Sequence, residues 1–211
     1  DGLVTGVQTC ALPILAGALT PIGCIRLRSA VDFYEHEAAN QVLPAHQGFE
    51  LQHIDAYLEA ASLHSMLAAG TTGVQGVAPK FLLATDAGGR WYPDMLLPDD
   101  QACEHWLLKL PRGNSDADRA VLRNEAAYLR VAQRCGIRST HAPMLLGEKL
   151  FVRRFDREVI ASADGKHLLH RLHQESLASL VGQRGFGAMH TQQALLMAMR
   201  QHVSDPAAET I

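Results

Sequence analysis

The residues best suited to chemistry are a glycine-bearing loop and two charged residues that follow it. The loop "AGTTGVQGVAPK" contains Gly70, Gly73 and Gly76, and glycine allows backbone amides to approach a phosphate group closely. Lys109, in the segment "HWLLKLP", supplies a cation, and Glu125, in the segment "RNEAAYLRVAQR", supplies a carboxylate that can pair with the lysine and orient it. Together these groups predict a site for a nucleoside triphosphate, which is large and highly anionic.

An extended segment further along the chain suits the base of such a ligand. Residues 152–155 lie in "KLFVRRFDR", and an extended backbone offers the donors and acceptors that adenine needs in an apolar cleft. The order of elements matches the small lobe of a protein kinase. The glycine loop is followed by a hairpin, by the strand that carries Lys109, by the helix that carries Glu125 and by this extended segment. The order of the whole set carries this prediction, because the loop alone lacks the full G-x-G-x-x-G spacing.

Each charged residue of this set also has a simpler interpretation. Lys109 alternates with apolar residues and fits an edge-strand lysine in solvent. Glu125 fits a solvated helix face, paired locally with Arg123 or Arg130, as well as it fits a partner of Lys109. Lys80 either holds phosphate or only begins a strand. The residues by themselves leave these alternatives open.

The residues around "RFDR" favour structural roles as well. Phe155 is expected to pack in the core, since a hinge contacts adenine through its backbone. Asp156 and Arg157 are expected to form an ion pair. Both expectations are compatible with a neighbouring nucleotide, because neither uses the backbone groups that would face the base.

Three histidines recur at three-residue spacing: His167, His170 and His173. On the helix predicted for this segment His167 and His170 share a face, which suggests a metal site. No carboxylate lies four residues from either of them, so exposed or capping histidines are the preferred interpretation. No metal ligand is therefore assigned.

Composition excludes several classes of protein. The 211 residues are 47% hydrophobic and 19% charged, with a net charge of −3, which gives no overall attraction to nucleic acid or to an anionic membrane. No apolar run approaches the roughly 20 residues that span a bilayer. Beyond the first 14 residues the cysteines are far apart, so a reducing cytoplasm is the expected location; they are Cys24, Cys103 and Cys135.

Hydrophobic periodicity and turn residues predict the elements that position these groups. Asp116 or Asp118 is expected to cap the helix that carries Glu125, and Gly136 to end it. The predicted strands lie within 22–27 and at 80–85, 90–92, 105–111 and 149–157; the predicted helices are 48–66, 119–134, 168–181 and 191–203; the predicted turns are 86–89 and 162–165.

Five segments resemble the HipA family of serine/threonine kinases, the toxins of HipA–HipB toxin–antitoxin systems: "GVAPKFLLA", "HWLLKLP", "RNEAAYLRVAQRCGI", "FVRRFDR" and "RLHQESLASLVG". The resemblance runs from about Pro21 to Gly182. It implies an α+β, protein-kinase-like fold: a small lobe with an antiparallel sheet, and the first helices of the large lobe. It also implies ATP and Mg²⁺ as cofactors, a HipB-like DNA-binding antitoxin as partner, and an aminoacyl-tRNA synthetase as a candidate substrate, with no direct binding of nucleic acid or membrane.

The resemblance assigns an ATP-binding role to residues of the loop, the lysine strand, the acidic helix and the hinge. Lys109 matches the ATP lysine, Glu125 the acidic residue of the following helix, and residues 153–155 the adenine-facing hinge. The complete set is Thr72, Gly73, Gly76, Val77, Lys80, Lys109, Glu125, Arg153, Arg154 and Phe155.

Two positions depart from the family pattern. Many members carry a self-phosphorylated Ser in the loop, where this chain has Gly73, so Thr71 and Thr72 are the nearest hydroxyls. The family also tends to read "QED..Q" where this chain has "QESLAS" at 174–179. Regulation by phosphorylation of the loop is therefore in doubt.

The chain is interpreted as three parts, the first from a match to adapter DNA and the other two from the family resemblance. Residues 4–14 resemble the translation of sequencing-adapter DNA, so 1–14 are interpreted as an artefactual leader that takes no part in the fold. Residues 15–47 are interpreted as the remnant of an N-terminal subdomain. Residues 48–211 are interpreted as the N-terminal half of the kinase domain, with the small lobe ending near 157 and the large lobe beginning at 158.

Kinase chemistry needs an Asp to orient the attacking hydroxyl, and Asp and Asn residues to hold magnesium. The family places them in a "D-x-H-x-K-N" loop and a later Asp, and this chain contains no such loop. The expectation is a HipA-like kinase fragment, truncated at both ends, that carries the ATP-binding half and is inactive alone. The alternative is a non-catalytic module, a split or degenerate kinase half that binds nucleotide or a partner protein.

Overall fold

The computed structural model describes residues 22–39, 48–63, 78–137, 141–162, 166–182 and 190–202; the predicted leader and residues 71–77 of the glycine loop lie outside them. The described elements, in chain order, are α2 (Arg28–Ala39), the 3₁₀ turn η1 (Leu51–His53), α3 (Ile54–Leu63), β1 (Lys80–Thr85), β2 (Trp91–Pro93), β3 (Glu104–Lys109), α5 (Asp116–Arg134), β4 (Met144–Leu146), β5 (Lys149–Arg153), β6 (Arg157–Ala161), β7 (His167–Arg171), α6 (Leu177–Leu180) and α7 (Gln192–His202).

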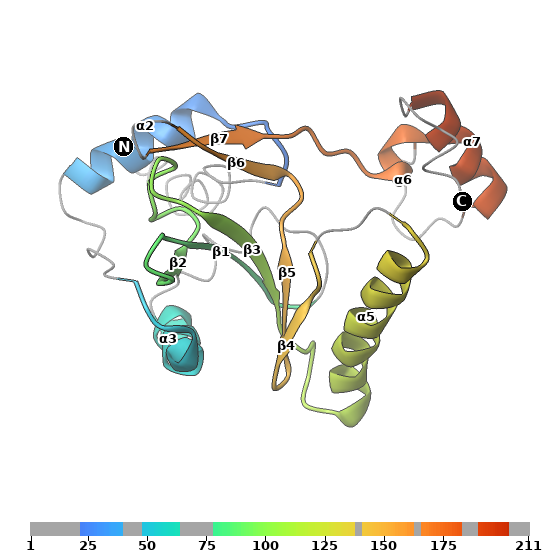
Figure 1. Ribbon diagram of the computed structural model, residues 1–211, viewed down its shortest axis with the longest axis horizontal. Coiled ribbons are helices and arrows are strands. Elements are labelled where there is room, and N and C mark those ends of the chain that lie inside the picture. The colour runs from blue at the N-terminus through green and yellow to red at the C-terminus, as the bar shows by residue number, and fades with distance from the viewer. Residues whose placement is uncertain are drawn as a thin grey trace, which may run out of the picture.

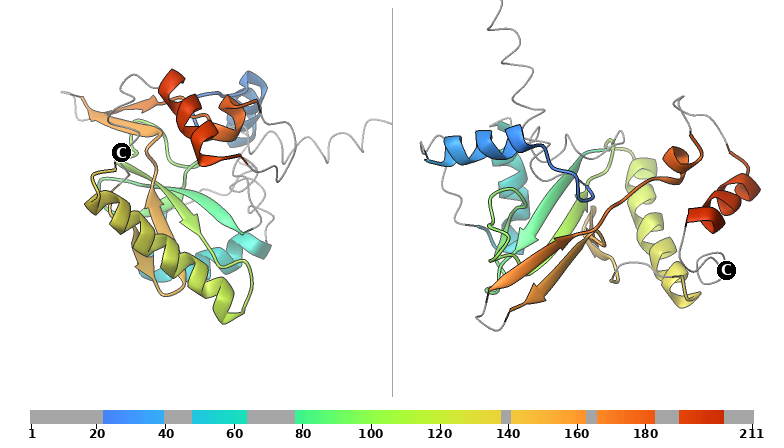
Figure 2. Two further views of the ribbon diagram at one scale, coloured as in Figure 1. Left: turned by 90° about the vertical axis from the view of Figure 1, so that its right-hand side faces the viewer. Right: turned by 90° about the horizontal axis from the view of Figure 1, so that it is seen from above.

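A five-stranded antiparallel sheet forms the centre of the fold, with the strand order β2-β1-β3-β5-β4. Helices α3 and α5 flank it, and the hairpin of β6 and β7 forms a second, two-stranded sheet (Figures 1 and 2). The predicted α+β class with antiparallel sheets is confirmed. No helix among the described residues is both long and apolar enough to cross a membrane.

The pleat of the sheet separates a core face from a face that carries charge. Phe81 lies opposite Leu108 across β1 and β3, and Leu108 lies opposite Phe151 across β3 and β5. These three side chains are buried in one cluster with Ile54 of α3. Because side chains alternate along a strand, Lys80 and Lys109, which are also cross-strand partners, lie on the opposite face.

Helix α5 packs on this second face of the sheet. Its N-cap is Ser115, whose side chain accepts from the amide of Asp118, while the Asp118 side chain accepts from the amide of Ser115. This capping box corrects the expectation that Asp116 or Asp118 is the cap itself. Leu122 and Ala126 of the helix pack against Leu150 of β5, so the intervening turn brings Glu125 towards the sheet.

The helix predicted at 168–181 is wrong. Residues 167–171 form strand β7, and only Leu177–Leu180 are helical. Leu169 is buried against Val159 of β6, its register partner, while Leu168 is exposed. This is the alternation of a strand with one covered face, and pairing with β6 overrode the local helical pattern.

Two other boundaries differ from the expectations. Residues 22–27 form no strand; they run irregularly into α2, and the side chains of Ile25 and Leu27 are exposed. The strand predicted at 149–157 is interrupted at Arg154–Asp156, where β5 ends and β6 begins. In the first segment the amide of Gly23 donates to the side chain of Asp156. In the second, the amide of Arg154 still donates to the carbonyl of His105 on β3, and the carbonyl of Asp156 accepts from the amide of Leu172.

The sheet core gives a direct test of this arrangement. Replacing Leu108, which is completely buried, by Ala should lower the free energy of unfolding by roughly 2–5 kcal/mol, through lost burial and a residual cavity. The matched control is Leu146→Ala on β4, where the side chain is 41% exposed and the change should stay within about 0.5 kcal/mol. Urea unfolding measures both, and equal losses would contradict the assignment of the core face.

Candidate functional site

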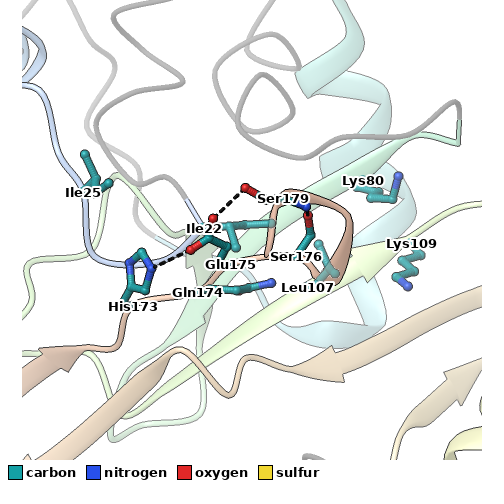
Figure 3. Close-up of a pocket in the computed structure, with 10 residues that line it drawn as sticks. All are labelled: Ile22, Ile25, Lys80, Leu107, Lys109, His173, Gln174, Glu175, Ser176 and Ser179. Atoms are coloured by element: carbon teal, nitrogen blue, oxygen red, sulfur yellow. Dashed lines mark hydrogen bonds and ion pairs between the residues drawn. The ribbon is translucent and has the colours of Figure 1, made fainter. Parts of the chain in front are cut away.

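A cleft of about 640 Å³ lies over the charged face of the sheet (Figure 3). Its floor carries Lys80 of β1 with Leu107 and Lys109 of β3, and one wall is formed by residues 173–176 and Ser179. Ile22 and Ile25, from the segment before α2, also line the cleft. Segments far apart in sequence therefore meet at the two lysines.

An ion pair between Lys109 and Glu125 lies at the edge of this cleft. The Nζ atom of Lys109 donates to Oε1 of Glu125, with side chains 21% and 32% exposed. The predicted pairing of the lysine strand with the acidic helix is thus confirmed, and the local pairing of Glu125 with Arg123 or Arg130 is not observed. The pair holds the ammonium group in a fixed position on the sheet.

Lys80 adds a second cation beside Lys109. Its Nζ atom donates to the carbonyl of Ala78 at 3.3 Å. Burial, and after it the charge of Lys109, lower the pKa of Lys80, while Glu125 opposes the shift. Two neighbouring ammonium groups repel one another, so this position favours an anionic ligand.

A smaller cavity of about 90 Å³ adjoins the cleft, and both are lined by Ile22, Leu107 and Gln174. Its other lining residues are Leu82, Val152 and the four residues Arg153–Asp156. No backbone hydrogen bond among the described residues occupies the N–H or C=O of Phe155. An apolar slot with unpaired backbone groups at its edge suits a flat heterocyclic ring.

Phe155 itself does not pack in the core, contrary to expectation. Its side chain is 59% exposed, although residues before and after it are buried. The bend between β5 and β6 turns this ring outwards, while the backbone of residues 153–156 stays at the small cavity. The sequence pattern could not show this, because an apolar residue after a buried strand usually continues inwards.

A network of buried charges fixes the backbone at this bend. The guanidinium of Arg154 donates to Asp156 at 3.0 and 2.8 Å and to Asp94 at 3.1 Å. Arg157 donates to Asp156 at 2.7 Å, which confirms the predicted ion pair. The Nδ1 atom of His105 lies 2.5 Å from Asp94. Sequence analysis missed Asp94 and His105, since no local spacing links them to "RFDR".

The charges of this network support one another. Burial alone raises the pKa of Asp156, but hydrogen bonds from Arg154 and the charges of both arginines outweigh it and hold that pKa below its ordinary value. Burial would also raise the pKa of Asp94, but the hydrogen bond and the charge of His105, followed by the charges of the two arginines, lower it below its ordinary value. Burial, and then the charge of Arg154, lower the pKa of Arg157 to about 10, which leaves it charged at neutral pH.

The same carboxylate anchors the segment that covers the cleft. The amide of Gly23 donates to Asp156 at 2.7 Å, and the carbonyl of Gly23 accepts from Arg157 at 2.9 Å. Gly23 has φ of +83°, and a Cβ here would lie 3.4 Å from the backbone nitrogen of Gln174. Glycine is therefore needed for its conformation, whereas a Cβ would make only an ordinary contact with Gln174. This anchor keeps Ile22 at the cleft.

The structure brings together the described members of the predicted site. Lys80, Lys109 and Glu125 lie at the large cleft, and residues 153–155 line the small cavity beside it. The side chain of Arg154 is buried in the ion network, so only its backbone faces the cavity. Thr72, Gly73, Gly76 and Val77, together with Thr71, lie outside the described residues.

The three histidines do not form a cluster. His167 lies 3.7 Å from the sulfur of Cys103, while His173 lines the cleft. Their segment is a strand followed by an irregular stretch, so the helical face assumed for His167 and His170 does not exist. In the part of the chain that the structure describes, no group of three or more His, Cys, Asp or Glu side chains could hold a metal ion.

Comparison with known proteins agrees with this geometry. The family model of the HipA-like C-terminal domain matches residues 72–211, more than half of the chain. No curated protein and no solved structure matches it. The family match starts just before β1 and includes both lysines, Glu125 and the bend at 153–157.

The ion network predicts a particular sensitivity to acid. Asp156→Asn removes the counter-charge of two buried arginines and should lower the free energy of unfolding by about 3–5 kcal/mol at neutral pH. Because the folded-state pKa of Asp156 is depressed, its stabilisation is present above the ordinary Asp pKa of about 3.9 and is lost as the pH falls through the folded-state value.

Urea unfolding between pH 7 and about pH 3 should therefore show a shallower acid loss in Asp156→Asn than in the unaltered chain. Asp100→Asn is the matched control, because Asp100 is exposed and, among the described residues, its carbonyl alone makes a hydrogen bond, with the amide of His167. If Asp156→Asn kept the stability and the acid slope of the unaltered chain, as Asp100→Asn should, the network would not fix the backbone between β5 and β6.

Proposed function

We propose, from the premise that the chain belongs to the family of the HipA-like C-terminal domain, that it is the nucleotide-binding part of a HipA-like serine/threonine kinase. ATP would bind with its phosphates in the large cleft and its adenine in the small cavity. The observation that carries the proposal is the placement of Lys109, paired with Glu125, in a cleft that adjoins the apolar slot at residues 153–156.

The cations of the cleft suit a triphosphate. Lys109 stands on the central strand and is oriented by Glu125 of α5, which is the lysine–glutamate arrangement that kinases use to hold nucleotide phosphates. Lys80 lies beside it on β1. Two ammonium groups on one rigid sheet supply charge-assisted hydrogen bonds at little entropic cost. The loop at 71–80, which would cover the phosphates, belongs to the same proposal.

The small cavity suits adenine. Leu82, Leu107 and Val152 provide apolar surface above the sheet, and Ile22 lies over the opening. The N–H and C=O of Phe155 provide one donor and one acceptor at the edge of the slot. A purine placed here would extend its ribose towards the lysines, because the two cavities meet at Leu107.

The remaining features of a kinase reaction rest on the family alone. The described residues contain no metal-ligand cluster, so they offer no fit for Mg²⁺, and no step of a mechanism is assigned to the metal. Members of the HipA family pair with HipB antitoxins. We propose a HipB-like antitoxin as partner, an aminoacyl-tRNA synthetase as candidate substrate and a cytoplasmic location.

A non-catalytic nucleotide- or partner-binding module is the second candidate. This module would have the same ATP site as the proposed kinase, but it would not transfer a phosphoryl group. The two are therefore separated by measuring transfer independently of binding.

Nucleotide binding is tested by calorimetry with ATP. Lys109→Ala should raise the Kd about tenfold, since a charge-assisted hydrogen bond contributes roughly 1.5–3 kcal/mol. The matched control is Lys149→Ala, because Lys149 pairs with Asp55 of α3 at 2.6 Å on the other face of the sheet, and its Kd should change by less than about twofold. Equal losses in both variants, or no binding by the unaltered chain, would contradict the proposal.

Phosphoryl transfer should be absent from the 211-residue chain. Transfer draws its rate from positioning the nucleophile and from neutralising the developing charge, and the residues that the family uses for both are not found in this sequence. Incubation with labelled ATP and Mg²⁺, followed by autoradiography, should show no labelled protein. Label that appears in the unaltered chain and disappears in Lys109→Ala would show a complete active site and overturn this prediction.

A further inference from the structure

A cysteine, a histidine and a glutamate form a chain of contacts at the mouth of the cleft. The Sγ atom of Cys24 lies 3.9 Å from Nδ1 of His173, and Nε2 of His173 lies 3.7 Å from Oε2 of Glu175. Ser179 donates to Oε1 of Glu175 at 2.6 Å. Figure 3 shows His173, Glu175 and Ser179 along one wall of the cleft.

The positions of Cys24 and His173 are set by buried groups. Cys24 follows Gly23, whose amide and carbonyl are both held by the buried pair of Asp156 and Arg157. His173 precedes Gln174, whose backbone packs against Gly23. Both side chains are exposed while their backbones are anchored, so the thiol and the imidazole are held near one another yet stay accessible to small molecules.

The contacts suit transfer of the thiol proton. The hydrogen bond from Ser179, and after it the contact with His173, hold the pKa of Glu175 below its ordinary value, so this side chain is a carboxylate. A carboxylate beside Nε2 favours the tautomer with its proton on Nε2. Nδ1 is then free to accept the proton of Cys24, which is the arrangement of an activated nucleophile with an oriented base.

We propose that Cys24 is a thiolation site and that its modification regulates the nucleotide cleft; the regulatory part rests on the proposed function. Nδ1 of His173 takes the thiol proton, and the sulfur of Cys24 attacks one sulfur of a small disulfide. The disulfide bond breaks, a mixed disulfide forms on Cys24, and the departing thiolate leaves with the proton. The net reaction consumes one disulfide, releases one thiol and is reversed by excess thiol.

The surroundings favour an anionic disulfide such as glutathione disulfide. Lys80 and Lys109 lie in the same cleft, and cations in a recess raise the local concentration of anions. A peptide-sized group on Cys24 would stand beside Ile25 and His173, two lining residues, and would obstruct entry of a triphosphate. Modification would thus compete directly with the nucleotide.

The other described cysteines provide matched comparisons. Cys103 is partly buried, and burial raises the pKa of its thiol. Cys135, like Cys24, is exposed. It lies at the end of α5 and makes no side-chain contact with a histidine or carboxylate among the described residues. Cys135 therefore reports the reactivity of an ordinary surface thiol.

Reactivity is tested with two variants that each keep one cysteine: Cys24 alone, with the other three cysteines changed to Ser, and Cys135 alone. Glutathione disulfide is the probe, and intact-protein mass spectrometry gives the second-order rate. Cys24 should react about tenfold faster than Cys135, and His173→Gln in the Cys24 variant should remove that advantage. Equal rates for the two cysteines, or no effect of His173→Gln, would overturn the assignment.

Regulation is tested separately with the Cys24-only chain. ATP binding is measured by calorimetry in the reduced form, after complete glutathionylation, and after reduction with dithiothreitol. The modified form should bind ATP at least about tenfold more weakly, with full recovery on reduction. Unchanged affinity after modification would overturn the regulatory role. If the reduced form did not bind ATP, the regulatory role would fall with the proposed function, while the rate comparison would still decide whether Cys24 is a thiolation site.

Discussion

The carboxylate of Asp156 is the group on which the site depends. It is 2% exposed and accepts hydrogen bonds from Arg154, Arg157 and the amide of Gly23. A buried charge is tolerated only when its partners offset its desolvation. Here two partners flank Asp156 in the segment between β5 and β6, and the third, Gly23, is 133 residues away in sequence. One side chain therefore ties the segment before α2 to the end of β5 and the start of β6, and residues of both segments line the small cavity.

The register of the sheet determines which groups face the cleft. Phe81 and Leu108 are opposite one another, as are Lys80 and Lys109, and the first pair is buried against α3. A slip of one residue would bring the lysines into that core and expose the apolar pair. The apolar side chains thus position the ammonium groups without touching them, and the helix cap at Ser115 contributes by fixing where α5, with Glu125, begins.

Local patterns were enough to predict β1, β2, β3 and β5, because alternation and turn residues act over a few residues, but they missed β4. They also left the pair of Lys109 with Glu125 open beside a local pairing of Glu125. They were not enough for β7, whose apolar residues suit either period and whose conformation is decided by pairing with β6. Nor could they place Phe155 outside the core or join Asp94 to Arg154, which is 60 residues away in sequence. These features arise from tertiary contacts that a window of sequence does not contain.

The two lysines are a local cost to the stability of the sheet. Like charges directly opposite on neighbouring strands destabilise a sheet, and the lowered pKa of Lys80 records burial and that repulsion. Glu125 offsets part of it through Lys109. A ligand with several negative charges would offset the remaining repulsion between the two lysines. Because such a ligand binds the folded chain alone, its binding free energy would also increase the stability of the fold. A neutral side chain in place of Lys80 would remove this repulsion. The local conflict at Lys80 and Lys109 is therefore the physical reason to regard the cleft as a binding site, and it comes from charge and register alone, independently of the family.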